Sequence, residues 1–147
     1  MGIKEFLGLK DEDVKKPLPV PMKWSKPFWD AAKQHKFVLK RCKSCGFIDH
    51  PPYLYCTNCS SEDHEWFEAS GKARLGAWAI NQYMVPFPFW DDMPYVVGFI
   101  ELPEGPRMIS NIVQCEQDKL VAGMELEVVW DDVSEEISLP KWRPVKK

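Results

Sequence analysis

Four of the five cysteines are arranged in two pairs whose spacing predicts a metal site. Cys42 and Cys45 form one C-x2-C pair, and Cys56 and Cys59 form a second pair after a gap of ten residues. Two residues between cysteines allow a tight turn to direct both sulfurs to one point, and two such turns complete a tetrahedral thiolate site. Gly46, directly after the first pair, suits the sharp turn of such a knuckle. We predict one structural Zn2+ ion, because four protein ligands leave no open position for water.

Two other interpretations of the cysteine pairs remain open. Disulfides are disfavoured in a chain that is expected to be cytoplasmic. Iron, as in rubredoxin-like electron carriers, uses the same four ligands, and spacing does not separate it from zinc. The fifth cysteine, Cys115, follows an expected strand and has no evident base beside it, so we interpret it as a buried structural thiol. His50 and His64 are expected at the surface, since four cysteines already complete the site.

A run of basic residues leads into the first cysteine pair and forms a second candidate site. Charge-assisted hydrogen bonds from such a cluster suit the phosphates of a ligand. The alternative is a solvated basic face without a ligand. The five cations fall within eleven residues and are Lys33, Lys36, Lys40, Arg41 and Lys43.

Residues 83–94 form a third candidate site, in which aromatic residues are interspersed with prolines. A small barrel cannot bury so many rings, and exposed apolar clusters usually mark a partner surface or a ligand wall. We predict that Phe87, Phe89 and Trp90 contact a larger partner or line its pocket. The alternative is a loop that folds back over the end of its own barrel.

The elements that position these residues begin with an arm and a helix. Residues 1–24 are expected to form an extended arm, because their prolines favour polyproline geometry. A helix is expected from the N-cap Ser25 to about His35, whose partial positive charge suits a helix C-terminus. A short strand over 37–41 then leads into the cysteine pairs.

From residue 72 onward the pattern changes to short strands. Turn signals such as Pro103-Glu104-Gly105-Pro106 separate ranges that are rich in β-branched and aromatic residues. A fifth strand is weaker, because Pro140 interrupts it. The expected strands are 73–83, 95–102, 108–114, 126–130 and 137–142, which predicts a small OB-type antiparallel barrel. The chain is thus expected to be mostly β, with an arm (1–24), a helix plus rubredoxin-like zinc ribbon (25–69), and an OB-fold barrel with a C-terminal tail (70–147).

Charge and composition narrow the classes of function. Residues 1–59 carry a net charge of +5 and residues 60–147 a net charge of −8, which together give the net charge of −3. No apolar stretch approaches the roughly 20 residues of a membrane helix, and the first residues lack a signal-peptide core. A cytoplasmic protein is expected. The acidic barrel disfavours nucleic-acid binding, although zinc ribbons and OB barrels are common in that class, so this alternative function remains open.

Several short segments resemble the family of acyl-CoA-associated zinc-ribbon/OB-fold proteins. The resemblance runs from about Trp24 to Trp130, and one departure is Tyr53, where the family often has an arginine. The segments that carry it are Arg41-Cys42-Lys43-Ser44-Cys45-Gly46, Pro51-Pro52, Cys56-Thr57-Asn58-Cys59, Ser70-Gly71-Lys72, Pro94-Tyr95-Val96-Val97-Gly98-Phe99-Ile100-Glu101-Leu102, Glu104-Gly105-Pro106-Arg107 and Gly123-Met124-Glu125-Leu126-Glu127-Val128.

The resemblance implies a function that spacing alone does not. Such proteins are typically non-catalytic partners of thiolases or related aldolases, in hetero-oligomers that act on a coenzyme A thioester. Small subunits of benzoylsuccinyl-CoA thiolases, from anaerobic toluene degradation, are a candidate group within the family. The resemblance therefore implies that the basic cluster binds coenzyme A and that the aromatic segment meets a thiolase-like catalytic subunit. The sequence shows no nucleophile elbow, phosphate loop or open metal site that would make the chain catalytic alone.

Overall fold

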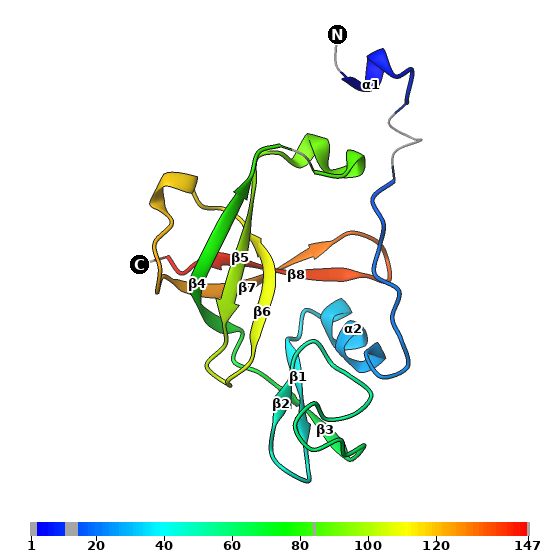
Figure 1. Ribbon diagram of the computed structural model, residues 1–147, viewed down its shortest axis with the longest axis vertical. Helices are drawn as coiled ribbons and strands as arrows, with labels where there is room; N and C mark the ends of the chain where they lie inside the picture. The colour runs from blue at the N-terminus through cyan, green and yellow to red at the C-terminus, as the bar shows by residue number, and fades with distance from the viewer. Residues whose placement is uncertain (1–2, 11–14, 84, 147) are drawn as a thin grey trace.

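The computed structural model, which describes residues 3–10, 15–83 and 85–146, contains two β-structures joined end to end. The first is a three-stranded sheet in the order β2-β1-β3, and the second is a closed barrel in the order β4-β5-β6-β8-β7. Figure 1 shows the small sheet below the barrel, with helix α2 beside the place where they meet. The predicted fold class, mostly β with a helix, a ribbon and an OB-type barrel, is confirmed.

The elements follow the expected order along the chain. They are α1 (Ile3–Phe6), α2 (Lys26–Lys33), β1 (Val38–Cys42), β2 (Ile48–Asp49), β3 (His64–Glu68), β4 (Lys72–Asn81), the 3-10 helix η2 (Phe87–Asp92), β5 (Tyr95–Glu101), β6 (Arg107–Ile112), the 3-10 helix η3 (Gln117–Lys119), β7 (Glu125–Asp132) and β8 (Ser138–Pro144).

Helix α2 starts where the sequence predicts, but Ser25 does not cap it in the expected way. The Ser25 hydroxyl accepts a hydrogen bond from the backbone N–H of Met22 at 3.0 Å and makes none to the helix amides. The helix buries Phe28 and Ala32. His35 then adopts a left-handed conformation (φ 58°), and its N–H donates to the carbonyl of Ala32 at 2.8 Å. This closure lets the chain turn directly into β1.

Strand β3 was missed by the sequence analysis. It pairs antiparallel with β1 along its whole length, from Val38 opposite Glu68 to Cys42 opposite His64. The signal available for it was a run of five residues with two aromatic side chains and without glycine or proline. Because β1 and β3 pair, the loops between them, which carry the four paired cysteines, start and finish at the same end of the small sheet.

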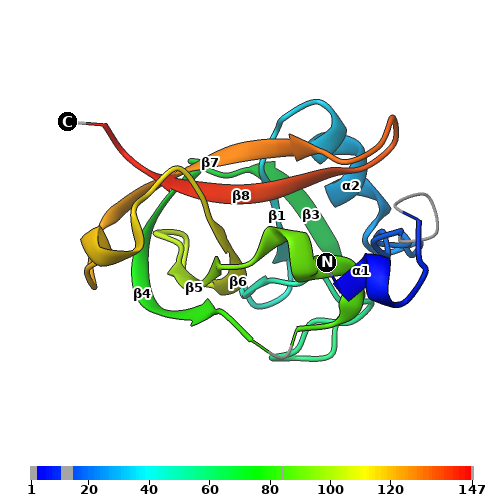
Figure 2. The ribbon, with the colours of Figure 1, turned by 90° about the horizontal axis from the view of Figure 1, so that it is seen from above.

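The barrel closes through β6 and β8, which form a single parallel pair, Ile112 opposite Trp142. Figure 2 shows β7 and β8 running together across the β4–β5–β6 part of the barrel. The interruption expected at Pro140 does not occur, since β8 pairs with β7 from Ser138 to Pro144. On the β6 side, the Ser110 hydroxyl donates to the Pro140 carbonyl at 2.6 Å. Proline is tolerated because a side chain, rather than a backbone ladder, links the strands there.

The core is continuous between ribbon and barrel. Trp142 of β8 is fully buried, and its ring meets that of Phe37 edge to face at a centroid distance of 5.5 Å. Phe37 in turn packs against Phe28 of α2 at 6.3 Å. Burial of these aromatic rings holds the two β-structures together as one packed unit.

The arm differs in part from the extended segment that the sequence predicts. Residues 3–6 form the short helix α1, whereas residues 15–22 have neither helix nor strand. Residues 1–2 and 11–14 of the expected arm, Met84 of the aromatic segment and Lys147 of the tail lie outside the described residues. In the described part of the chain, no helix combines the length and the apolar character needed to cross a bilayer.

Candidate metal centre

The four paired cysteines converge at the tip of the ribbon. The Sγ atoms of Cys42, Cys45, Cys56 and Cys59 all lie within 4.8 Å of one another. The Cys42–Cys59 and Cys45–Cys56 sulfur distances are both 3.6 Å. A tetrahedron with Zn–S bonds of about 2.3 Å has edges of about 3.8 Å, so these distances fit four ligands of one ion. They are far longer than the roughly 2.05 Å of a disulfide, which removes that alternative.

The two C-x2-C turns have the same backbone geometry. In the first, the amide of Gly46 donates to the Cys42 carbonyl at 2.9 Å; in the second, Ser60 donates to Cys56 at 2.9 Å. Gly46 and Ser60 occupy equivalent places and both have positive φ, 76° and 61°. The expected role of Gly46 is thus confirmed, while its counterpart is a serine that sequence reasoning did not single out.

Hydrogen bonds and neighbouring thiols shift the pKa values of the cysteine thiols in opposite directions. Burial acts to raise the pKa of the Cys42 thiol, but the backbone amide of Cys45 and the Cys59 thiol outweigh it and lower the pKa to about 6. The backbone amide of Ser61 acts to lower the pKa of Cys59, yet the neighbouring thiols and burial raise it to about 12. Four thiolates this close together require a cation, and Zn2+ supplies the charge that ionises all of them.

Two buried charged side chains, Asp49 and Lys40, contact the loops that carry the metal site. Asp49 of β2 is 4% exposed and accepts hydrogen bonds from the amide and the hydroxyl of Thr57 in the second turn. Lys40 of β1 stands opposite Asp49, is 6% exposed, and donates to the Tyr53 carbonyl. Burial lowers the pKa of Lys40, and Asp49 opposes that shift. Lys40 therefore stabilises the ribbon and leaves the set of candidate phosphate-binding residues.

The other four cations of the basic cluster are accessible, and two of them contact acidic side chains. The Arg41 guanidinium lies 4.2 Å from the ring centroid of Phe67 and 3.3 Å from a carboxylate oxygen of Glu65. Lys43 forms an ion pair with Asp63 at 3.4 Å. Lys33 and Lys36, at the end of α2 and just beyond, are exposed. Acidic residues beside β3 thus neutralise part of the positive charge that the sequence emphasised.

The two histidines near the ribbon are not the surface residues that we expected. The His50 ring packs against Phe28 at 5.6 Å and Phe37 at 6.4 Å, and burial lowers its pKa to about 4. The Nδ1 atom of His64 lies 2.8 Å from the Glu62 carbonyl, while its Nε2 atom is buried without a hydrogen-bond partner among the described residues. Neither histidine belongs to the thiolate cluster.

The aromatic segment after β4 forms the compact 3-10 helix η2. The Trp90 indole N–H donates to the Val85 carbonyl at 2.8 Å, and its ring meets Phe87 edge to face at 4.8 Å. Phe87, Phe89 and Trp90 are each partly buried. The loop is therefore ordered by its own aromatic contacts, and it presents partial rather than fully exposed ring faces.

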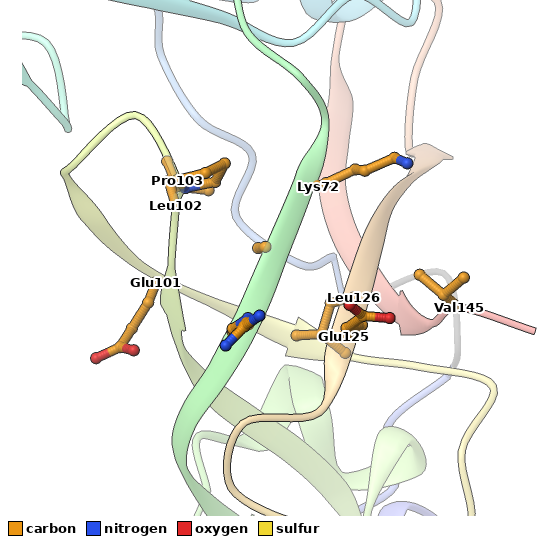
Figure 3. Close-up of a pocket in the computed structure, with 9 residues that line it drawn as sticks. Lys72, Glu101, Leu102, Pro103, Glu125, Leu126 and Val145 are labelled. Carbon is orange, nitrogen blue, oxygen red and sulfur yellow. The ribbon is translucent and has the colours of Figure 1, made fainter.

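Among the described residues, the surface away from the metal includes a groove along β4 and a groove beside α2. One, of about 500 Å3, lies along β4 and has a rim of mixed charge from Lys72, Arg74, Glu101 and Glu125 (Figure 3). The other, of about 460 Å3, lies between α2, the ribbon and the β6–β8 edge; apolar residues including Trp24, Phe28, Trp29, Pro51 and Ile109 line it. Grooves of this size accommodate small ligands or side chains of a partner.

The surroundings of Cys115 disfavour the thiolate form that a nucleophile needs. It is half-buried rather than buried as expected, and its thiol lies 3.4 Å from the Glu116 carbonyl. Burial, the largest influence, raises its pKa, which lowers the thiolate fraction at neutral pH. Among the described residues, the metal centre is closed by its four cysteines and leaves no position for substrate.

Two family models match this chain, one over the ribbon and one over the barrel. Residues 29–65 match the model described as "ChsH2, rubredoxin-like zinc ribbon domain", and residues 66–131 match "ChsH2, C-terminal OB-fold domain". The first match supports zinc over iron at the four-cysteine site, which confirms the predicted cofactor.

The curated relatives carry several different activities in their names. A "Probable enoyl-CoA hydratase alpha subunit" of Thermomonospora curvata is 37% identical over 80% of this chain, but the match spans only 36% of that relative. A "DUF35 domain-containing scaffold protein" of Methanothermobacter thermautotrophicus is 35% identical over 71% of this chain and 78% of the relative. "Benzoylsuccinyl-CoA thiolase subunit BbsA" of Thauera aromatica is 32% identical over 49% of this chain and 48% of the relative.

One solved structure matches almost end to end. It is described as "Ltp2-ChsH2(DUF35) aldolase", with 33% identity, a TM-score of 0.77, and coverage of 86% of this chain and 98% of the solved chain. A protein of the DUF35 family from Sulfolobus solfataricus, at 16% identity and a TM-score of 0.57, shares the fold.

Proposed function

Because this chain belongs to the ChsH2/DUF35 family of zinc-ribbon and OB-fold proteins, we propose that it is the zinc-bearing partner subunit of a thiolase-like or aldolase enzyme that acts on a coenzyme A thioester. The observation that carries this proposal is the match to 98% of a solved chain whose description joins ChsH2 to Ltp2 in an aldolase. Because the match covers nearly the whole solved chain and 86% of this one, we propose that the two chains have the same role beside a catalytic subunit.

The substrate class is proposed from what the names of the relatives share. The names of the enoyl-CoA hydratase subunit and the benzoylsuccinyl-CoA thiolase subunit denote different reactions, and both name an acyl group held as a coenzyme A thioester. The reaction type therefore belongs to the catalytic partner, while the thioester is common to both. Benzoylsuccinyl-CoA is the first acyl group that we would assay, since the BbsA match supports it over about half of the chain.

The chain is proposed to act by assembly and by binding rather than by catalysis. Its metal is enclosed by four thiolates, so zinc holds the loops between β1 and β3 in place and activates no water. The accessible cations Lys33, Lys36, Arg41 and Lys43 are proposed to meet the phosphates of coenzyme A. The acidic partners of Arg41 and Lys43 are exposed, so a phosphate can replace them. The partly buried rings of Phe87, Phe89 and Trp90 are proposed to meet the catalytic subunit.

Native mass spectrometry of the tagged chain, purified gently from its own host, tests the partner proposal. The expected result is a complex that contains one zinc per copy of this chain and a second subunit of thiolase or aldolase size. A matched preparation of Phe87→Ala/Phe89→Ala/Trp90→Ala should retain zinc and lose the second subunit. A zinc-bearing monomer as the only species, or a species bound to nucleic acid, would overturn the proposal and favour the nucleic-acid alternative.

The coenzyme A contacts are tested on the purified complex. Charge reversal at Lys33, Lys36 and Lys43 together should weaken coenzyme A binding at least tenfold, with a steeper loss at low salt. Charge reversal at Lys119, a lysine on the exposed η3 segment that pairs with Glu116, serves as the control. Equal affinities for the two variants would remove the basic cluster from the proposed function and leave the partner role intact.

A further inference from the structure

The arm before α2 exposes apolar side chains at every second position. Leu18, Val20 and Met22 are 43%, 78% and 52% exposed, and Trp24, two residues further on, is 38% exposed. The segment thus exposes four apolar side chains within seven residues, and exposed apolar clusters usually mark an interaction surface.

Prolines keep this segment extended and unsuited to joining a sheet. Pro17, Pro19 and Pro21 alternate with the apolar residues. Each ring fixes its own φ and removes a backbone N–H, and each also restricts the residue before it to extended geometry. Six consecutive residues, 16–21, therefore have little conformational freedom to lose on binding. Because Pro17, Pro19 and Pro21 lack N–H donors, one edge of the segment cannot donate to a neighbouring strand, so we expect its side chains to supply most of the contact, in a groove.

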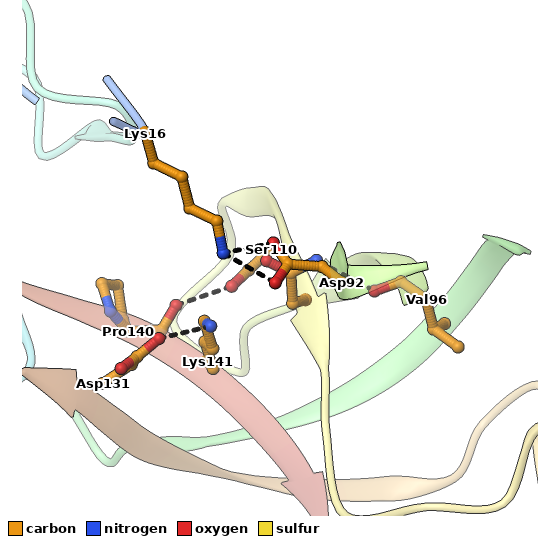
Figure 4. A network of polar contacts seen from close by, with 8 residues as sticks. Lys16, Asp92, Val96, Ser110, Asp131, Pro140 and Lys141 are labelled. Carbon is orange, nitrogen blue, oxygen red and sulfur yellow. Dashed lines mark hydrogen bonds and ion pairs between the residues drawn. The ribbon is translucent and has the colours of Figure 1, made fainter. Parts of the chain in front are cut away.

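Lys16, just before the alternating prolines, contacts the 3-10 helix η2. The Lys16 ammonium lies 2.6 Å from the Asp92 carboxylate (Figure 4). The same ammonium lies 5.9 Å from the centroid of the Phe89 ring. Both partners of this ion pair are nearly half exposed, at 46% and 40%, so the pair adds little stability and a partner can replace it. The arm therefore extends the surface that the proposed function assigns to the catalytic subunit.

The other end of the arm reaches the apolar groove beside α2. Trp24 lines that groove together with Phe28 of the helix and Pro51 of the ribbon. The chain then turns, since the Met22 carbonyl accepts the N–H groups of Ser25 and Lys26 at 2.9 and 2.8 Å. The exposed apolar side chains thus run from η2 to this groove and stop where the helix begins.

We propose that residues 15–24 form a docking strap that lies in an apolar, acid-rimmed groove of the catalytic subunit. The strap contains three lysines, Lys15, Lys16 and Lys23, and no acidic residue, which sets the charge expected at the rim of that groove. It precedes residues 29–131, which the two domain descriptions match, so it adds contacts beyond those of the ribbon and barrel. This inference rests on the proposed function, which supplies the catalytic subunit.

The experiment titrates the full-length chain against the purified catalytic subunit identified by native mass spectrometry. Replacing Leu18, Val20 and Met22 with serine should raise the Kd at least tenfold. The control replaces Val121 and Val145, which are 56% and 37% exposed on the barrel, with serine and should change the Kd less than twofold. A synthetic peptide of residues 15–24 should compete with the wild-type chain, and the same peptide with the three serines should not.

Each outcome decides a different point. An unchanged Kd for the strap variant, with normal complex formation by the wild type, overturns the strap and leaves the proposed function standing. Dimers of the isolated chain in sedimentation that vanish in the strap variant overturn it in favour of a second copy as the occupant. If the wild-type chain binds no catalytic subunit, the proposed function fails and the strap falls with it. Zinc content and far-UV circular dichroism confirm that each variant is folded.

Discussion

The imidazole ring of His35 lies parallel to the indole ring of Trp130, with centroids 5.7 Å apart and planes 3° apart. The Nε2 atom of the same imidazole is 2.8 Å from a carboxylate oxygen of Asp132, and that hydrogen bond lowers the pKa of Asp132. His35 ends the helix that leads into the ribbon, whereas Trp130 belongs to β7 of the barrel. One side chain thus joins the two β-structures at their surface, in addition to the buried contact of Phe37 with Trp142.

Replacing His35 with asparagine should lower the free energy of unfolding by about 1 kcal/mol, since an aromatic pair contributes about 0.5–1.5 kcal/mol. Asparagine tolerates the left-handed backbone at this position, so the substitution removes the ring and its contact with Asp132 without adding backbone strain. Urea denaturation of His35→Asn, Trp130→Leu and the double variant measures the coupling. Additive losses in this cycle would show that the stacked rings do not interact.

Removal of zinc should unfold the ribbon and spare much of the barrel. The loops between β1 and β3 have few buried apolar residues besides their cysteines, so the metal contributes most of their stability. Hydrogen exchange after chelation, or in Cys45→Ser, should show loss of protection in β1–β3 and retained protection in β4–β8. Cys115→Ser is the matched control and should keep one zinc per chain. Uniform loss of protection would mean that the barrel depends on the ribbon for its fold.

Stability should fall as the pH is lowered from about 6.5 to about 4 because of His50. Its pKa is about 4 in the folded protein and about 6.5 in an unfolded chain. Between these two pH values His50 is protonated in the unfolded state and neutral in the folded state. The free energy of unfolding therefore decreases by up to about 1.4 kcal/mol for each pH unit by which the pH is lowered. Above pH 6.5 this loss is absent.

The pH effect is measured against His50→Phe, which keeps an aromatic ring between Phe28 and Phe37 and does not titrate. Denaturant unfolding at pH 7, 6 and 5, with zinc content determined at each pH, should give a shallower dependence for the variant. Equal slopes for the two proteins would assign the acid sensitivity to other groups, such as the zinc ligands.

The junction between ribbon and barrel depends on Glu104. A carboxylate oxygen of Glu104 accepts a hydrogen bond from the backbone N–H of Ser70 at 2.7 Å. This hydrogen bond joins the segment 70–72, between ribbon and barrel, to the turn at 104–107. Glu104→Ala should cost about 1 kcal/mol of stability, the contribution of one hydrogen bond to a charged group at a partly exposed site. Glu101→Ala is the control, because Glu101 is exposed and its pair with Arg107 is long, at 3.8 Å. A thermal shift of equal size in both variants would contradict this role.

The metal site and the kind of fold could be predicted from the order of the residues alone. A tetrahedral thiolate site needs only two short C-x2-C turns, and such local geometry is written in consecutive residues. Short strands rich in β-branched residues and separated by turns likewise predicted the barrel. Strand β3 and the continuity of β8 were not predicted. These two strands form because they pair with β1 and β7, and residue composition alone does not reveal such pairing.

The availability of each candidate side chain to a ligand or a partner depends on how the chain packs in three dimensions. Lys40 looks in the sequence like any other member of the basic cluster, but register places it opposite Asp49 and buries it. His50, expected at the surface, is enclosed by Phe28 and Phe37 from the helix and from the residue before β1. The reason is common to these residues: burial arises from contacts between segments distant in sequence, and composition does not reveal which segments meet.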